Sequence, residues 1–252
     1  MKQTFTLLFL CFFVFNSTPR AEAGAKKSPT PCPTFHDITE CPDKGCGPGA
    51  DAKLNKRKNI APDDQQTAVL RSIDWMKNLP NPQHFTAKNT KRDELKDLGE
   101  GQKITIVAWA LAARKGVKES CNCKLASKAD TDNHIVLVDP ALEDPTLDDN
   151  EKRDSETAEF TPRVRLDHPN LNQDKLESLI DPEWNPGETA TQGKLLVRVT
   201  GFLMFDSEHF LSNALRRHNN WEIHPVLKME YCPEDKVCEG SSDANWIDLE
   251  SE

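Results

Sequence analysis

The chain opens on a short apolar run whose flanks are typical of an export signal. Residues 5–15 are almost entirely apolar, follow Lys2, and precede the small-x-small sequence Ala21-Glu22-Ala23. A run of this length is too short for a transmembrane helix, which needs about 20 residues, and the order matches a cleaved secretory signal. We therefore predict a signal peptide at residues 1–23.

The next segment, residues 24–62, shows no sustained period of 2 or 3.6. It carries six prolines, four glycines and the cysteines Cys32, Cys41 and Cys46. Prolines and glycines at this density interrupt regular structure. The pattern predicts an irregular segment held by disulfides rather than by a packed core.

Helical spacing begins after this segment. Val69, Ile73 and Met76 recur three to four residues apart, behind the acidic pair Asp63-Asp64 and ahead of Pro80. This predicts one helix over about 64–78. Residues 83–102 are polar and rich in lysine, and we expect them to form a solvated connector.

From residue 103 the pattern changes to short runs rich in Ile, Val and aromatic residues. They predict strands at 103–113, 134–139, 160–166, 194–206 and 221–232, with a helix near 170–180. The alanines after Trp109 suit a helix equally well. Pro162 lacks an N–H for the ladder, so the third strand is predicted to be an edge or bulged strand there.

Five strands with a helix between the third and the fourth is the order of the OB-fold. That fold is a Greek-key barrel whose ligand face is flanked by the loops joining strands 1–2 and 4–5, and Gly201 would permit the bend that a small barrel needs. A β-sandwich would usually have about seven strands. We predict a mainly β protein with a five-stranded OB-fold-like Greek-key barrel over 103–232. An N-terminal helix within 63–102 and the irregular segment precede it, and a loose acidic tail over 233–252 follows.

Composition narrows the choice of partner. The chain has 32 Lys+Arg against 41 Asp+Glu, a formal net charge of −9 and a pI near 5.4. Non-specific nucleic-acid binding is therefore not expected, because such binding relies on a basic field. After signal cleavage no membrane-spanning segment is expected, and the predicted partner is an unknown envelope or extracellular ligand.

The cysteines indicate an oxidising compartment. Of eight, Cys11 leaves with the predicted signal, and the remaining seven cannot all pair within the chain. The short spacing of Cys232 and Cys238, just beyond the last strand, predicts a disulfide between them. Cys121 and Cys123 either form a thiolate clamp or provide one disulfide to Cys32, Cys41 or Cys46.

Several short motifs together resemble a group of secreted bacterial OB-fold-like proteins without an established activity. They are Glu119-Ser120-Cys121-Asn122-Cys123, Asp132-x-His134, Thr161-Pro162-Arg163, Arg198-Val199-Thr200-Gly201 with Phe205-Asp206-x-Glu208-His209, and Trp221-Glu222-Ile223-His224-Pro225. The resemblance covers about 103–232. One departure is Ala108-Trp109, where the group has Gly-Tyr. The resemblance implies the fold and export, and no reaction.

Candidate site residues gather in the two predicted loops and on the strands beside them. Glu222 and His224 lie two apart and share one face of a strand, and Asp132 and His134 repeat the spacing. The third strand separates these pairs by roughly 10 Å. The ligand-binding candidates are Glu119, Asn122, Asp132, His134, Arg163, Arg165, Asp206, His209, Arg217, Glu222 and His224.

Three functional hypotheses follow. The leading one is a secreted or periplasmic binding module for an oligosaccharide, a peptide or a small anion, which Arg163 and Arg165 on the third strand would hold. The alternative is a metal-dependent hydrolase with phosphoesters as the candidate substrate class. Its divalent ion, Zn²⁺ for example, would bind to Asp132, His134, His209, Glu222 and His224. In the third, Glu222 and His224 pair with each other and with Arg163 or Arg217 in a structural network. No common nucleophile or nucleotide motif is present.

Overall fold

The computed structural model describes residues 32–59, 65–82, 84–85, 92–148, 153–186, 193–208 and 217–251. The chain divides into two compact units at residues 30 and 31, and every described residue belongs to the second. The predicted signal peptide, Asp63-Asp64 and His209 lie outside the described residues.

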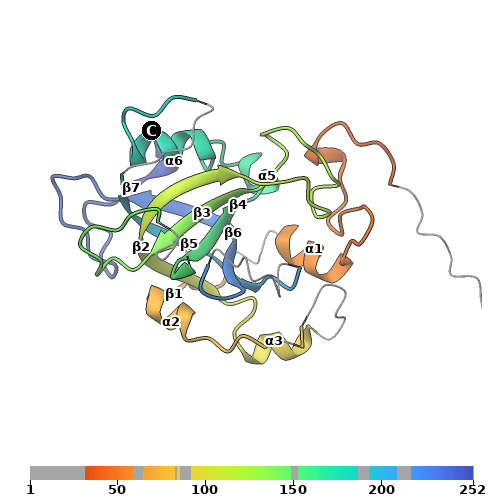
Figure 1. Ribbon diagram of the computed structural model, residues 1–252, viewed down its shortest axis with the longest axis horizontal. Helices are drawn as coiled ribbons and strands as arrows, with labels where there is room; N and C mark the ends of the chain where they lie inside the picture. The colour runs from red at the N-terminus through yellow and green to blue at the C-terminus, as the bar shows by residue number, and fades with distance from the viewer. Residues whose placement is uncertain are drawn as a thin grey trace, which may run out of the picture. The chain divides into compact units, whose positions relative to one another are not determined.

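Five strands close into a mixed β-barrel (Figure 1). Around the ring they are β2 (Lys103–Lys115), β3 (Asn133–Val138), β4 (Glu156–Phe160), β6 (Trp221–Tyr231) and β5 (Leu195–Phe205), and β5 pairs back onto β2. β4 and β6 run parallel, whereas the other barrel pairs are antiparallel. The predicted mainly β class and the five-stranded barrel are confirmed.

The barrel interior is apolar because alternate residues of each strand point inward. Ile106, Ile135, Ala158 and Ile223 represent four of these strands in the core. Helix α6 (Gln173–Ile180) packs against β2 (Figure 1), and its first turn is capped by the Asn172 side chain. This helix lies between the third and fourth barrel strands in sequence, as predicted.

The third strand lies earlier in the chain than predicted. β4 ends at Phe160, and residues Pro162–Arg165 form the short helix α5 instead of a strand. Thr161 is extended and Pro162 occupies the first helical turn, where a missing N–H costs nothing and the fixed φ favours a helix. The prediction of a strand over 160–166 is therefore wrong, and Arg163 and Arg165 leave the sheet.

The N-terminal elements also differ from the prediction. The single helix expected over 64–78 is divided into strand β1 (Val69–Arg71), parallel to β2, and helix α2 (Ile73–Lys77), which begins after the N-cap Ser72. The irregular segment contains η1 (Ile38–Glu40) and helix α1 (Ala52–Asn59), and the connector contains α3 (Asp93–Asp97). Each is short, and the apolar period is too brief to identify it.

The acidic tail is not loose. β7 (Ile247–Asp248) pairs with β6, and η2 (Leu249–Ser251) follows it. Leu249 is fully buried in the core, and the Trp246 indole donates a hydrogen bond to the carbonyl of Glu239. Two apolar side chains thus anchor a segment whose charge alone had indicated disorder.

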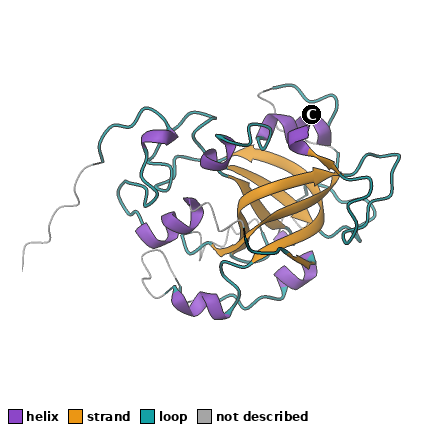
Figure 2. Cartoon of the chain, turned by 180° about the vertical axis from the view of Figure 1, so that it is seen from behind, coloured by secondary structure: helices purple, strands orange, loops and turns teal. Residues whose placement is uncertain are grey.

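Three disulfides are present, Cys32–Cys46, Cys41–Cys123 and Cys232–Cys238, and among the described residues Cys121 is the free, buried cysteine. The last two pairings are among those that the sequence predicts. Three disulfides in one chain indicate an oxidising compartment. Figure 2 shows the loops and helices of the cysteine-bearing segment beside the barrel. In the described part of the chain, no helix combines the length and the apolarity needed to cross a bilayer.

Candidate functional site on the outer face of the barrel

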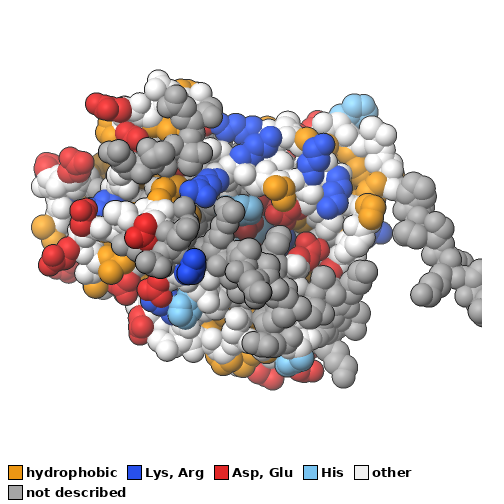
Figure 3. Space-filling view, viewed as in Figure 1, with side chains coloured by type: hydrophobic (Ala, Val, Ile, Leu, Met, Phe, Trp, Pro, Cys, Tyr) orange, Lys and Arg blue, Asp and Glu red, His pale blue; other side chains and the backbone are white. Residues whose placement is uncertain are grey.

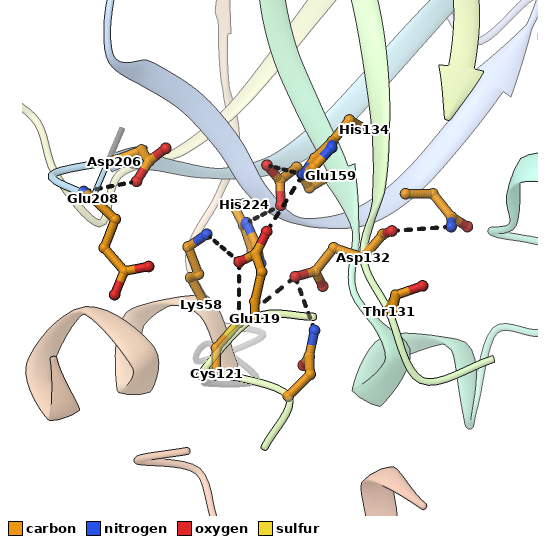
Figure 4. Close-up of polar contacts among 12 residues, drawn as sticks. Lys58, Glu119, Cys121, Thr131, Asp132, His134, Glu159, Asp206, Glu208 and His224 are labelled. Carbon is orange, nitrogen blue, oxygen red and sulfur yellow. Dashed lines mark hydrogen bonds and ion pairs between the residues drawn. The ribbon is translucent and has the colours of Figure 1, made fainter. Parts of the chain in front are cut away.

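A set of ionisable side chains lies on the outer face of three neighbouring strands (Figure 4). His134 on β3 is paired in register with Glu159 on β4, and β6 supplies Glu222 and His224. Their neighbours Ile135, Ala158 and Ile223 point into the core, so strand alternation directs the ionisable residues outward.

This face is covered by segments from before β2 and from between β2 and β3. The β2–β3 loop contributes Glu119, Cys121 and Asp132, and helix α1 contributes Lys58. The Lys58 side chain is 2% exposed, and its Nζ donates to Glu119 Oε2 over 2.9 Å. Burying an ammonium without a partner would be very costly. The Lys58–Glu119 pair therefore accompanies the packing of α1 onto the barrel.

Glu159 is the centre of the cluster. Its Oε1 lies 3.1 Å from His134 Nε2, and its Oε2 lies 2.9 Å from His224 Nδ1. Burial disfavours the carboxylate, but His134 and His224 outweigh it and hold the pKa of Glu159 well below its usual value. Burial opposes the His224 cation too, and Glu159 nevertheless raises the pKa of His224 to about 10. One carboxylate thus joins two imidazoles through its two oxygens.

The loop carboxylates differ in their state. Burial opposes ionisation of Glu119, but Lys58 and His134 lower its pKa to about 2. Burial, reinforced by Glu119 and Glu159, raises the pKa of Asp132 to about 6 although His224 opposes the shift. Asn122 Nδ2 donates a 3.0 Å hydrogen bond to Asp132 Oδ2 and so orients that carboxyl group.

Cys121 lies between the two loop carboxylates. Its Sγ is 3.4 Å from Glu119 Oε2 and 3.7 Å from Asp132 Oδ2. Burial and these two neighbouring acids raise the pKa of the Cys121 thiol well above its usual value. The group therefore remains a protonated thiol that donates to the carboxylates, rather than a nucleophilic thiolate.

Arg217 extends the cluster toward the end of β5. Its guanidinium donates to Glu222 Oε2 over 2.6 Å and to Asp206 Oδ2 over 2.7 Å. The side chains of Glu222 and Asp206 are 0% and 2% exposed. Two charge-assisted hydrogen bonds to buried carboxylates fix the guanidinium, so Arg217 is a structural member of the cluster.

Five buried polar atoms of the cluster have no hydrogen-bond partner among the described residues. They are Glu119 Oε1, Asn122 Oδ1, Asp132 Oδ1, His224 Nε2, and Glu159 Oε2, which is ion-paired with His224. Buried polar atoms are normally satisfied. The ligand atoms of Glu119, His134 and Glu159 lie within 4.8 Å of one another, and so do those of Asp132, Glu159 and His224. A third set joins Glu119, Cys121 and Asp132, so Glu119, Asp132 and Glu159 each belong to two of the three sets. Glu159 is the one of these that contacts both histidines.

Fixed charges in the cluster do not balance. The five buried carboxylates are Glu119, Asp132, Glu159, Asp206 and Glu222. Lys58 and Arg217 are the permanent cations paired with them. Leaving Asp206 aside, the other four carboxylates exceed these two cations by two among the described residues, and burial of such an excess is unfavourable. Protons on the two histidines or a bound divalent cation can compensate it.

The structure brings most predicted site residues together and separates a few. Within the cluster lie Glu119, Asn122, Asp132, His134, Asp206, Arg217, Glu222 and His224. Arg163 donates to the Cys41 carbonyl, and Arg165 donates to Asn133 Oδ1 and to loop carbonyls. Placing these two arginines on a ligand-binding strand was wrong, because α5 directs them to the backbone of the covering segments.

Sequence reasoning missed the central residue of the site. Glu159 was overlooked because the third strand was placed after it, although Ala158 and Phe160 alternate with it as core residues do. Strand alternation over 156–160 is the signal that identifies it. Lys58 has a weaker signal, since it lies four residues after the buried Leu54 in α1 and so on the same helix face.

Replacing Glu156 by Gln is expected to stabilise the protein in alkaline solution. Glu156 is fully buried, neither carboxylate oxygen has a described partner, and burial raises the pKa to about 8 against the opposing charge of Arg217. Here the pKa of the carboxyl is higher in the folded state than in the unfolded state. Such a group contributes stability that is present below the unfolded-state pKa and is lost as the pH rises through the folded-state pKa. E156Q should therefore raise the free energy of unfolding by roughly 2–4 kcal/mol at about pH 9 and change it little at about pH 4.

Urea unfolding at the two pH values measures this difference. Asp154→Asn is the matched control, because Asp154 is half-exposed and paired with Lys77 and His218. An E156Q variant whose stability relative to wild type is the same at both pH values would contradict the prediction.

Comparison of the chain with family models, with curated proteins and with solved structures gives no match. A functional proposal therefore depends on the geometry and chemistry of the site.

Proposed function

We propose that this chain is an exported OB-fold-like binding module that holds a divalent cation on the outer face of the barrel. The observation that carries the proposal is Glu159, a buried carboxylate shared by two sets of metal-ligand atoms. Two imidazoles with carboxylates suit Zn²⁺ or Mn²⁺. The unpaired atoms of Glu119, Asp132 and His224 support it, since a cation would satisfy groups that the protein leaves unsatisfied.

The charge excess also supports a cation. A divalent ion bound at Glu159 would neutralise the excess of two carboxylate charges among the described residues. In the metal-free protein the same balance requires protons on His134 and His224. In the competing hypothesis of a purely structural network, these two protons alone compensate the carboxylates and no metal binds. Direct measurement of metal binding therefore separates the two hypotheses.

The OB-fold identity and export belong to the same proposal. The closed barrel with a helix between its third and fourth strands supports the OB-fold, and the export signal predicted at 1–23 agrees with three disulfides. The ligand face proposed here is flanked by the loops that join the first strand to the second and the fourth to the fifth. An acidic chain of this kind is not expected to bind nucleic acid non-specifically.

Metal analysis tests the proposal. Protein purified from its natural compartment without added metal should contain close to one Zn²⁺ or Mn²⁺ per chain by plasma mass spectrometry. Chelator-treated protein should regain one ion in a calorimetric titration. Glu230→Gln is the matched control, because Glu230 is a buried β6 carboxylate paired with Arg198 outside the cluster. Failure of the treated wild-type protein to bind either ion would refute the proposal.

Metal-dependent hydrolysis is the second candidate function, favoured by the exposure of His134. Its side chain is 34% exposed, whereas those of Glu119 and Glu159 are 5% and 4% exposed. An ion held by these three residues would therefore face solvent on one side, which is the open position that a catalytic ion needs. When bound, it would lower the pKa of a ligated water and polarise an ester. Turnover of bis(4-nitrophenyl) phosphate in the metal-loaded protein tests this activity.

A further inference from the structure

An arginine on β2 lies beside the strand residues that form the proposed cation site. Arg114 on β2 is paired in register with His134, and His134 is paired with Glu159 on β4. The neighbouring residue Ala113 belongs to the core, so Arg114 points to the outer face together with His134. Arg114, His134, Glu159 and His224 therefore form one row across four strands.

Arg114 has no acceptor for its guanidinium in the part of the chain that the structure describes. It is partly exposed, and its Nε is buried without a partner. By contrast, Arg217 donates to two carboxylates and Arg198 forms a bidentate pair with Glu230. A guanidinium with a desolvated, unpaired donor is suited to an anion that arrives from solvent.

We propose that Arg114 binds a phosphate group of the module's ligand beside the cation site, an inference that rests on the proposed cation-binding function. A phosphate ester has enough oxygens for the fork of Arg114 and for the ion held at His134 at the same time. A carboxylate has two oxygens, both of which a bidentate fork engages, so it has no third oxygen to give to the ion alone. Figure 3 shows His and acidic side chains near the centre of one face, bordered by Lys and Arg side chains.

The charge of the whole chain makes a local cation necessary. The formal net charge of the protein is −9, so it repels a phosphate at long range. Binding at short range therefore requires specific hydrogen-bond donors or cations at the site. The acidic cluster by itself would oppose an anion. Within the row of strand residues that the structure describes, Arg114 is the permanent cation beside the bound ion, and Lys58 is already paired below the surface.

The probe is methyl phosphate, titrated by calorimetry into protein saturated with Mn²⁺. Arg114→Ala should lower its affinity roughly 10- to 100-fold, and Arg114→Lys, which keeps the charge but loses the fork, should fall between. Mn²⁺ affinity, measured without phosphate, should stay within about twofold of wild type. The matched control is Arg153→Ala, which removes the same charge at an exposed position before β4. It should bind methyl phosphate as wild type does.

Each result has one meaning. If R114A binds Mn²⁺ and methyl phosphate as tightly as wild type, the role of Arg114 is refuted and the cation site stands. If acetate binds as tightly as methyl phosphate, the assignment to phosphate is refuted. If wild-type protein does not bind Mn²⁺ or Zn²⁺, the proposed function fails first and the inference fails with it. Far-ultraviolet circular dichroism establishes that R114A is folded, and R114K repeats the test if it is not.

Discussion

Replacing Glu159 by Gln is expected to lower the affinity of the site for Mn²⁺ or Zn²⁺ more than about 100-fold. Loss of a group that only orients a ligand typically costs 10–100-fold, and Glu159 is itself a ligand in the two sets that contain a histidine. The substitution is nearly isosteric, so the loss would come from the charge. Titration calorimetry of the chelator-treated variant measures it.

The same variant tests the metal-free network. In the metal-free variant the protonated His134 and His224 lose their common carboxylate partner. The free energy of unfolding should therefore fall by roughly 3–5 kcal/mol, the cost of an uncompensated buried charge. The Glu230→Gln control should keep its metal affinity. His134→Gln, at a partly exposed position, should lose metal with a smaller loss of stability. Unchanged metal affinity in both site variants would contradict a cation site at Glu159.

Removing the Cys41–Cys123 disulfide is expected to destabilise the protein by about 4 kcal/mol. The bond links residues 82 apart in sequence, and cross-links that close long loops restrict the unfolded chain most. It also joins the cysteine-bearing segment to the β2–β3 loop, which carries Glu119 and Asp132. The double variant Cys41→Ala/Cys123→Ala should therefore bind metal more weakly as well.

The matched control is Cys232→Ala/Cys238→Ala, which removes a disulfide between residues six apart in sequence. Its expected loss is about 2 kcal/mol, with metal affinity unchanged. Urea unfolding and metal titration compare the two double variants. Equal losses of stability, or normal metal affinity in the Cys41/Cys123 variant, would show that the long cross-link does not hold the site together.

The barrel was predictable because its strands are long and apolar on alternate residues. β2, β5 and β6 each have eleven or more residues, so the alternation of buried and outward residues repeats several times in each strand. β4 has five residues and is followed by Pro162, so its position was ambiguous. The prediction of one helix over 64–78 was wrong for a similar reason. Val69 continues the helical spacing of Ile73 and Met76, although Val69 lies in strand β1.

The site was predictable in part, for a different reason. Glu222 and His224 share a face through local spacing, and that spacing can be read from the sequence. Lys58 and Arg114 reach the cluster through tertiary contacts: α1 packs over the barrel face, and β2 pairs with β3. The spacing of Lys58 from Leu54 places it on the buried face of α1, but burial of a lysine is decided by a partner elsewhere in the chain, which the local sequence does not show.

The pairing between β4 and β6 has the fewest register pairs around the barrel. Among the described residues it has two register pairs, Thr157 with Glu222 and Ala158 with Ile223, whereas β3 and β4 share five. The contact between Glu159 and His224 crosses this interface. Any ligand that binds both strands therefore holds the ring shut, and opening of the ring must release it. Binding of the proposed cation would in this way be linked to closure of the barrel, and amide exchange along β4 should slow when the ion is added.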